Sequence, residues 1–428
     1  MDSSRSTAHG SPSAAASTPP TLAATFPFWL KLGFISFGGP AGQIAIMHRE
    51  VVERRGWMDE RGFMRALNFC MLLPGPEALQ LAIYLGWRMH GVRGGLVAGL
   101  CFFLPAVALL LGLSFIYVLY GEVPAVAAAL TGLKAVVVAL IAQAVVKVAS
   151  RALRGPVALL LATGGFLALA VLHIAFPWVL AAAAAAGMLL LRPSDGAAEP
   201  AGATQRRVLP AGGVLAGGLL LWLLPLALVT LALGGGSLYA KVYLFFTQVA
   251  LVTFGGAYAV LAYVNQQVVE SLGWITQAQA VAGLALAETT PGPLVIVLQF
   301  MGFMAGWNDP GTLGQAQGAV LAALLAAWAT FLPSFVFIFL GAPHLAKLQA
   351  NPRLAGAMAG ITAAVVGVIA SLAVSFGRAV LLPGGAEAPA WGAIAIALAA
   401  LALLLRTRLD VLWVIAGGAL AGLLLGAA

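Results

Sequence analysis

Two carboxyl groups and an amino group lie inside long apolar segments of this chain, where a charge is costly. Glu77, Lys134 and Glu288 stand in stretches that read as helices, and Lys31 lies near the end of another. An ionisable side chain in an apolar helix is a functional candidate by default. Burial raises the pKa of a carboxyl group, which suits proton carriage, and a buried lysine can bind an anion or pair with a carboxylate. Lys31 is also placed to extend its charge to a polar surface.

The tripeptide Pro-Gly-Pro occurs beside both carboxyl groups. Pro74-Gly75-Pro76 directly precedes Glu77, and Pro291-Gly292-Pro293 follows Glu288 by three residues. Each proline removes a backbone hydrogen bond, and the helix that begins after the break has N–H groups without intrahelical acceptors. Such an N-terminus attracts anions. The pair of breaks predicts an anion site. The alternatives are simple kinks and, for Glu77, a carboxylate that only caps its own helix.

A second kind of break, Phe-Gly-Gly, also occurs twice. Gly38-Gly39 precedes Pro40, and Gly255-Gly256 precedes Ala257. Glycine permits unusual backbone angles and close approach to a ligand; close helix packing through small residues is the alternative. Amide and hydroxyl side chains near the breaks can donate hydrogen bonds to an oxyanion. The candidate substrate-binding residues are Gly38, Gly39, Pro40, Gln43, Pro74, Gly75, Pro76, Gln80, Lys134, Gly255, Gly256, Thr290, Pro291, Gly292, Pro293 and Gln299, and the candidate proton carriers are Glu77 and Glu288.

These motifs belong to an internal repeat. Residues 36–76 align with 253–293 at a constant offset of 217, and residues 103–105 align with 331–333 at an offset of 228. In an apolar chain, a repeat of this length indicates a membrane protein with two homologous halves. The charges are not repeated, because Glu77 aligns with a leucine, Glu288 with a methionine and Lys134 with a threonine.

The composition supports an all-α polytopic membrane protein. The chain of 428 residues is 62% hydrophobic and 8% charged, with a mean hydropathy of +1.01, whereas a soluble domain has about 25% charged residues. Continuous apolar runs exclude a β-barrel with alternating residues. The net charge of +8 lies mostly in short loops, so we expect orientation signals and no nucleic-acid partner. Cys70 and Cys101 are interpreted as packing residues. The sequence has no zinc spacing, nucleotide fingerprint or nucleophile elbow, so we expect no cofactor, no metal and no enzyme.

Thirteen helices are predicted, in two repeats with broken or re-entrant helices. We expect a disordered tail at 1–25, a first repeat at 26–191, a linker at 192–208, an extra transmembrane helix at 209–233 and a second repeat at 240–428. The extra helix places equivalent helices an odd number of crossings apart, which predicts inverted topology. The predicted helices are 26–46, 63–88, 94–119, 124–148, 156–172, 174–191, 209–233, 240–263, 278–306, 317–341, 355–376, 389–405 and 410–427.

Basic loop residues predict a cytoplasmic N-terminus and an external C-terminus. The N-terminal side has thirteen: Arg5, Arg88, Arg93, Lys147, Arg151, Arg154, Arg192, Arg206, Arg207, Lys347, Arg353, Arg406 and Arg408. The other side has seven: Lys241, Arg378 and the cluster Arg49, Arg54, Arg55, Arg61 and Arg65. The cluster either lies outside among neighbouring acidic residues or returns to the cytoplasm because 26–46 is re-entrant.

At these residues the chain resembles the chromate ion transporter family in its long, two-domain form. The matching pieces include Phe37-Gly38-Gly39-Pro40 with Gln43, His48-Arg49-Glu50, Gly56-Trp57, Leu73-Pro74-Gly75-Pro76 with Gln80, and Phe103-Leu104-Pro105, within 26–380. In the second half, Ala257 replaces proline. The resemblance implies chromate efflux across a bacterial-type inner membrane, driven by membrane potential or a proton gradient, with chromate resistance.

The substrate and the mode of transport stay open. Sulfate is a tetrahedral dianion like chromate, and a site of N–H and hydroxyl donors separates such ions poorly. The alternatives are a transporter or channel for sulfate or another tetrahedral oxyanion, and a membrane enzyme that modifies the oxyanion. The expected partners are the oxyanion and the lipid bilayer, and a homodimer is an open option.

Overall fold

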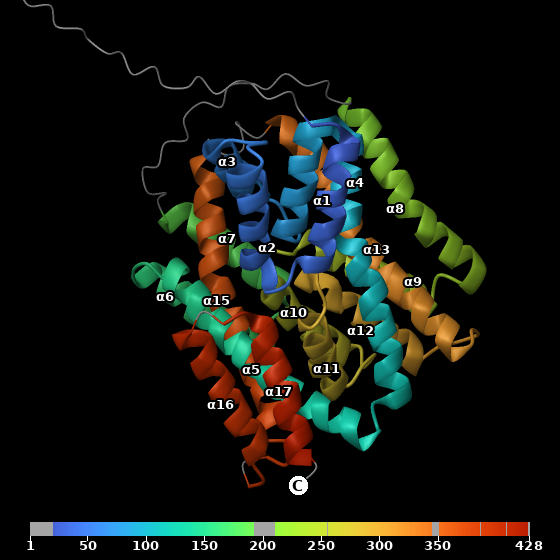
Figure 1. The fold of residues 1–428 in the computed structure, drawn as a ribbon, viewed down its shortest axis with the longest axis vertical. Coiled ribbons are helices and arrows are strands. Elements are labelled where there is room, and N and C mark those ends of the chain that lie inside the picture. Colours follow the sequence, from blue (N-terminus) through green and yellow to red (C-terminus); the bar gives the residue numbers. More distant parts are fainter. Residues whose placement is uncertain are drawn as a thin grey trace, which may run out of the picture.

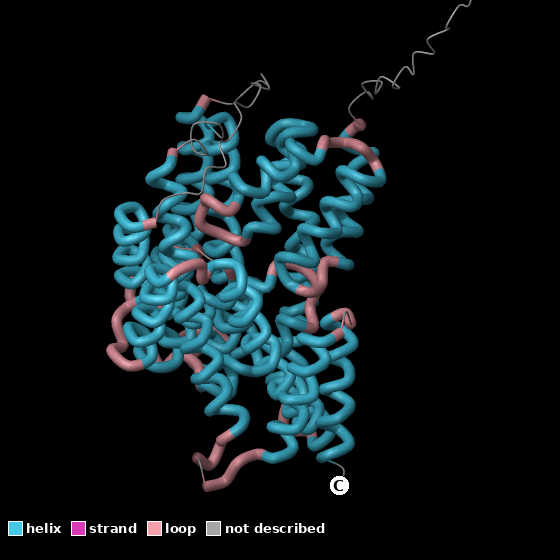
Figure 2. The backbone as a smooth tube through the Cα atoms, turned by 90° about the vertical axis from the view of Figure 1, so that its left-hand side faces the viewer, coloured by secondary structure: helices cyan, strands magenta, loops and turns pink. Residues whose placement is uncertain are grey.

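The computed structural model is helical throughout the residues that it describes, which are 20–191, 210–254, 256–344, 351–385, 387–407 and 409–426. No strand is present within these ranges, and Figure 2 shows short loops between the helices. Gly255, the predicted linker 192–208, most of the predicted tail 1–25 and the basic residues Arg5, Arg192, Arg206, Arg207, Lys347 and Arg408 lie outside the described residues. The first helix begins at Leu22, four residues before the first predicted helix, and the Thr21 hydroxyl accepts a hydrogen bond from Ala24 N–H.

The first half begins with short helices and ends with longer ones. Three of its helices, at 124, 156 and 176, have proline in their first turn, where a missing N–H costs nothing. In chain order the elements are α1 (Leu22–Ile35), α2 (Gly39–His48), the π-helix η1 (Arg49–Arg54), α3 (Glu60–Cys70), α4 (Glu77–Tyr120), α5 (Pro124–Ala152), α6 (Pro156–Ala170) and α7 (Phe176–Leu190).

A single long helix, α8 (Ala211–Leu233), precedes a second half in which the same kinds of element recur in the same order. The π-helix recurs as well, at a position that matches η1 in the repeat. The elements are α9 (Leu238–Leu251), α10 (Ala257–Asn265), η2 (Gln266–Ser271), α11 (Gln277–Glu288), the 3-10 turn η3 (Leu294–Ile296), α12 (Val297–Asn308), α13 (Gln315–Gly341), the 3-10 turn η4 (Ala342–His344), α15 (Pro352–Leu381), α16 (Trp391–Arg406) and α17 (Val411–Gly426).

Four of the predicted helices are each interrupted by a break. The predicted helix 26–46 is α1 and α2, and 240–263 is α9 and α10. The predicted 63–88 is α3 and the first arm of α4, and 278–306 is α11, η3 and α12. Among the described helices, five are long and apolar enough to cross a membrane: α4, α5, α8, the helix at 315–344 and α15. The breaks divide four of the other predicted helices, and α6, α7, α16 and α17 have 15 or 16 residues each, so the count of thirteen crossings stays a prediction.

Helix α4 is itself folded back at His90 and Gly91. Both residues have non-helical backbone angles, and Gly91 has φ +68°. A Cβ added to Gly86 would lie 2.3 Å from the carbonyl oxygen of Gly94, so the arms 77–90 and 91–120 pack tightly side by side. The first arm brings Glu77 back into the interior, while the second arm is long enough to span.

The chain between α1 and α2 turns back and does not continue across the molecule. The guanidinium group of Arg55, which follows η1, lies 5.5 Å from the ring centroid of Phe28 in α1 and 4.7 Å from that of Trp57. The rings of Phe28 and Trp57 are 5.6 Å apart. Figure 1 shows α1, α2 and α3 grouped at one end of the molecule. The basic cluster at 49–65 therefore lies beside the beginning of α1, which agrees with the re-entrant alternative.

Two arginines of the basic cluster form hydrogen bonds with a neighbouring carboxylate. Arg54 donates a hydrogen bond to Glu50 at 2.7 Å, and Arg55 donates one at 3.4 Å. Partial burial raises the pKa of the Glu50 carboxyl group, but the hydrogen bonds and charges of the two arginines outweigh it, so the pKa lies below its ordinary value. The His48 ring contacts the carboxylates of Glu53, at 3.2 Å, and Glu60.

The long helices of each half pack against short helices of the other half. A Cβ on Gly132 of α5 would lie 2.0 Å from the carbonyl oxygen of Gly418 in α17, and a Cβ on Gly360 of α15 would lie 2.2 Å from that of Ala183 in α7. Such close backbone contact is typical of small-residue packing between membrane helices. Gly132 and Gly360 are equivalent in the repeat, so each half makes the corresponding close contact with a short helix.

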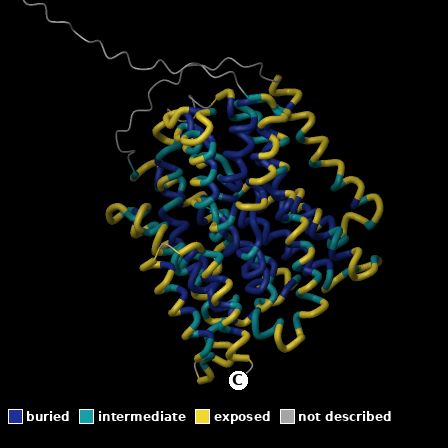
Figure 3. The backbone as a smooth tube through the Cα atoms, in the orientation of Figure 1, coloured by how far each residue is buried: buried dark blue, intermediate teal, exposed yellow. Residues whose placement is uncertain are grey.

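The surface of the molecule is strongly apolar. Helix α8 buries only Val214 and Val229, and leucines cover most of its exposed length. Figure 3 shows α8 as an exposed segment at the side, with the buried residues in the middle of the molecule. An exposed apolar surface of this extent fits lipid contact.

Candidate functional site

The four predicted breaks are present as abrupt turns of the backbone. Gly38 and Gly39 have φ +82° and +71°, and Gly256 has φ +95°. Gly75 and Gly292 have φ +131° and +106°. Only glycine adopts such angles without strain. The breaks end α1, α3, α9 and α11 inside the molecule and start new helices there.

Each Pro-Gly-Pro break is hydrogen-bonded to the Phe-Gly-Gly break of the other half. The N–H of Gly75 donates to the carbonyl oxygen of Thr253 at 2.8 Å, and the N–H of Gly292 donates to that of Ser36 at 2.8 Å. Ser36 and Thr253 are equivalent in the repeat, and each directly precedes the phenylalanine of its break. The two bonds are therefore copies of one interaction, and they bring all four breaks together.

A small cavity lies where the breaks meet. It is lined by Pro40, Gln43, Gly75, Pro76, Glu77, Ala78, Thr253, Gly256, Ala257, Pro293, Leu294 and Val295. Its volume of about 20 Å³ holds about one water molecule. A tetrahedral oxyanion has five heavy atoms, so the cavity is closed around a space too small for it.

Four helix N-termini point their first turns at this cavity. They are the starts of α2, α4, α10 and the η3–α12 segment, each represented in the lining. In α4, the first helical hydrogen bond runs from Gln80 N–H to the carbonyl oxygen of Pro76. The N–H groups of Glu77, Ala78 and Leu79 therefore have no acceptor within the helix. Each N-terminus carries roughly half a positive charge. Four of them offer about two positive charges, which matches a dianion.

Glu77 is the ionisable residue in the cavity lining. It stands in the first turn of α4 and is half-buried. Ionised, it would cancel about one of the two positive charges and repel an anion.

Glu288 lies beside the cavity and does not line it. It is the last residue of α11, it is buried, and one oxygen accepts a hydrogen bond from the hydroxyl of Tyr258 in α10 at 2.6 Å. This bond joins α10, which begins at the second Phe-Gly-Gly break, to α11, which ends at the second Pro-Gly-Pro break. Sequence reasoning missed Tyr258, although a tyrosine two residues after the Gly-Gly break of an apolar helix is a usable signal.

The predicted glutamines donate hydrogen bonds to backbone carbonyl groups. Gln43 Nε2 donates to the carbonyl oxygens of Ser36 and Gly292, Gln80 donates to Pro74 at 2.7 Å, and Gln299 donates to Val107 at 2.9 Å. Of the three, Gln43 lines the cavity. Gln43 and Gln80 thus occupy carbonyl groups that the breaks leave without helical donors, and the role of the three glutamines as oxyanion donors stays a prediction.

Three other predicted residues support the breaks from outside the cavity. Thr290 donates to the carbonyl oxygen of Leu286 at 2.9 Å, and Pro74 and Pro291 interrupt the helices without lining the cavity. Sequence reasoning also missed Ser334 of α13, whose hydroxyl lies 2.8 Å from the place where a Cβ on Gly75 would be. No local motif marks Ser334, because only the packing of α13 brings it there.

Lys134 is not at the break cavity. It lies on α5 and lines a separate, larger pocket with Arg378 of α15. Lys134 therefore does not share the break cavity with the free N–H groups of the helix N-termini, which corrects the prediction from the sequence. The reason is the packing of α5 against α15, α16 and α17, which keeps Lys134 away from the breaks.

These features define a multi-pass helical membrane protein in which broken helices enclose a central cavity lined by four helix N-termini. A family model described as Chromate transporter matches residues 23–188 and 240–423, which include all four breaks. The chain belongs to the chromate transporter family.

Curated relatives agree with this assignment. The chain is similar to a chromate transport protein of Pseudomonas aeruginosa, with 32% identity over 368 residues that cover 82% of this chain and 80% of that protein. It is also similar to a chromate transport protein of Cupriavidus metallidurans, with 29% identity over 409 residues that cover 94% and 93% of the two chains. These names point to a transporter and not to an enzyme. No solved structure matches the chain.

Proposed function

We propose that this protein exports chromate from the cytoplasm by secondary active transport. The observation that carries the proposal is the convergence of four helix N-termini on one cavity, in a chain whose relatives are named chromate transport proteins. The fixed partial charge of about +2 suits a tetrahedral dianion. Resistance to chromate follows from efflux.

The two halves are inverted repeats, with α8 as the odd crossing between them. The exchanged hydrogen bonds of Gly75 and Gly292 support a two-fold relation between the halves. In Figure 1, α1 to α3 lie at one end, and α16, α17 and the C-terminus lie at the other. The N-terminus is cytoplasmic, because the basic cluster at 49–65 lies beside the start of α1 and joins the basic loops assigned to that side.

Transport requires the breaks to separate, because the cavity of about 20 Å³ is closed around a space too small for chromate. Motion of one half against the other opens the cavity to one face at a time. Glu77 is the first candidate for the coupling proton, since its carboxylate and the substrate compete for the same positive field. Glu288 is the second, since its bond with Tyr258 must adjust when α10 and α11 move.

Everted membrane vesicles test this proposal directly. Labelled chromate should accumulate in vesicles that contain the protein, and control vesicles from cells without the gene should not accumulate it. Valinomycin with potassium removes the membrane potential and nigericin removes the pH gradient, so the ionophore that abolishes uptake identifies the driving force. Uptake that survives the collapse of both gradients would refute secondary active transport.

Two further measurements in the same system separate the alternatives. Sulfate that competes fully with chromate, and is itself accumulated, would make this a general oxyanion transporter. Voltage-clamped bilayers distinguish a channel, because unitary currents that do not saturate with chromate would contradict the carrier.

A further inference from the structure

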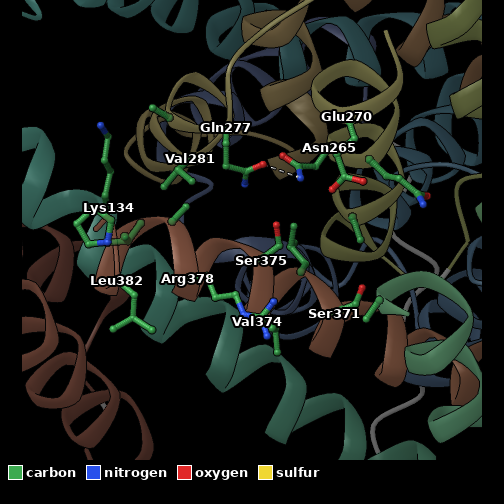
Figure 4. A pocket seen from close by; sticks show the side chains of 18 of the residues that line it. Lys134, Asn265, Glu270, Gln277, Val281, Ser371, Val374, Ser375, Arg378 and Leu382 are labelled. Atoms are coloured by element: carbon green, nitrogen blue, oxygen red, sulfur yellow. Dashed lines mark hydrogen bonds between the residues drawn. The ribbon is translucent and has the colours of Figure 1, made fainter. Parts of the chain in front are cut away.

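A second, larger pocket lies on the side of the break cavity that faces the connection between α15 and α16. Its volume is about 850 Å³. One wall is formed by the end of α10, η2 and the start of α11, and the opposite wall by α5 and α15. Leu382, Pro383 and Ala390 form its edge. Figure 4 shows Gln277, Asn265 and Glu270 on one side of this hollow and Arg378 on the opposite side, with Lys134 at one edge and its amino group directed away from Arg378.

The pocket extends toward the break cavity along α10. Ala257 at the start of this helix lines the break cavity, and Ala262 lines the larger pocket. Five residues of α-helix rise about 8 Å. An ion in the pocket would therefore be within about two helical turns of the breaks, on the side where the C-terminus lies.

Two basic side chains in the pocket have no acidic partner. Within the part of the chain that the structure describes, neither Lys134 nor Arg378 makes an ion pair or a hydrogen bond. Helices α5 and α15 contact each other near both residues. A Cβ added to Gly377, next to Arg378, would lie 3.9 Å from a methyl group of Val138, which is one helical turn from Lys134. The other ionisable residues that line the pocket are Glu270 and His173, which face each other at 3.9 Å.

At two positions the opposite wall has neutral amides where the first half has ionisable groups, and Glu270 of η2 also lies on this wall. Asn265 Nδ2 donates to Gln277 Oε1 at 3.1 Å, and the Gln277 amide nitrogen then has no acceptor among the described residues. The equivalent positions in the first half are His48 and Glu60, which also contact each other. Glutamine in place of glutamate removes a negative charge from this wall and leaves unused N–H groups.

We propose that this pocket is a second oxyanion site, in which Lys134 and Arg378 bind the tetrahedral dianion on the C-terminal side of the breaks. The unpaired cations provide the charge, and the Gln277 amide provides an additional donor. The proposal rests on the proposed function for the identity of the anion, and it gives the exported ion a place to bind after it leaves the break cavity.

Equilibrium binding of labelled chromate to the purified full-length protein tests the second site. We expect the double variant Lys134→Met/Arg378→Met to bind one ion fewer per chain than the wild type. Each single variant should weaken the second site by about tenfold, as expected for loss of a charged hydrogen bond. Lys134→Arg keeps the charge and should restore binding. Lys147→Met is the matched control, because Lys147 is an exposed lysine on the same helix outside the pocket.

The outcomes separate the two proposals. Equal numbers of bound ions per wild-type chain and per double-variant chain, with unchanged affinity, overturn the second site and leave chromate transport in vesicles as a separate result. Sulfate binding that falls by one ion per chain in the double variant, without chromate binding or transport, would retain the second site and overturn chromate as the substrate. A double variant that elutes as a monodisperse protein excludes misfolding as the cause of the loss.

Discussion

We expect the substitution Gly75→Ala to disrupt the break cavity, because Gly75 has no room for a Cβ. The added Cβ would lie 2.6 Å from Gln80 Nε2 and 2.8 Å from Ser334 Oγ, so both side chains must shift. In addition, φ is +131°, a backbone region that costs a non-glycine residue about 1–3 kcal/mol. With the displacement of two polar groups, the total is about 3 kcal/mol. If that energy is lost from the closed state, transport falls by about 100-fold.

Initial rates of labelled chromate uptake in everted vesicles measure this loss, normalised to protein in the membrane. Gly112→Ala is the matched control, because a Cβ at Gly112 meets no atom within 4 Å and the residue is in a helix. Alanine should be neutral or slightly stabilising there. Gly292→Ala should resemble Gly75→Ala, since its Cβ would lie 2.7 Å from the Cβ of Ala106 at φ +106°.

A second substitution separates the two causes of the loss. Ser334→Ala removes the hydroxyl that the new Cβ meets, so Gly75→Ala/Ser334→Ala should recover part of the rate, while the cost of the backbone angle remains. A Gly75→Ala variant with the wild-type rate and thermal stability would refute the reasoning, because it would show that neither the contact nor the angle constrains the break.

Three further predictions concern ionisable groups. Glu77→Gln should flatten the pH dependence of the half-saturating chromate concentration, because an ionised carboxylate about 4 Å from a dianion costs about 8 kcal/mol at an effective dielectric constant of 20; an unchanged pH profile would contradict this role. Glu288→Gln should change the pH dependence of chromate flux in proteoliposomes, and Tyr258→Phe should lower the flux by about tenfold through loss of a buried hydrogen bond; unchanged flux in both would exclude the pair from coupling. Because the pKa of Glu50 is lowered in the folded protein, its ionised form adds stability above the ordinary carboxyl pKa and loses that contribution as the pH falls. Glu50→Gln should therefore reduce the free energy of unfolding at pH 7 by about 0.5 kcal/mol and have a smaller effect at pH 3, and an equal effect at both values would contradict the pairing with Arg54.

The breaks could be predicted from the sequence because proline and glycine act on their own backbone. Pro74-Gly75-Pro76 and Gly38-Gly39 interrupt helices wherever they stand, and the structure has breaks at both. The partners of the breaks could not be predicted. Ser36 and Gly292 are 256 residues apart, and only the packing of helices between them brings their backbones within 2.8 Å.

Predictions for long side chains were weaker because their direction depends on neighbouring helices. The prediction for Lys134 rests on its charge alone. The packing of α5 against α15 places this residue at the larger pocket and not at the break cavity. The backbone carbonyl groups that accept from Gln43 and Gln299 lie 249 and 192 residues away in the sequence, so these partners could not be predicted. Glu77 was predicted at the cavity and lies there, since a helix N-terminus fixes the place of its first residue.

Because of these contacts between the halves, we expect that neither half forms the cavity without the other. Each half lacks the carbonyl acceptor for its own Pro-Gly-Pro break and the small-residue groove for its own long helix, and it obtains both from the other half. Helix α8 buries only two residues, so it acts mainly as a tether that raises the effective concentration of one half near the other. Residues 1–191 and 210–428, expressed as separate chains, should therefore be inactive alone and should regain chromate uptake when they are produced together.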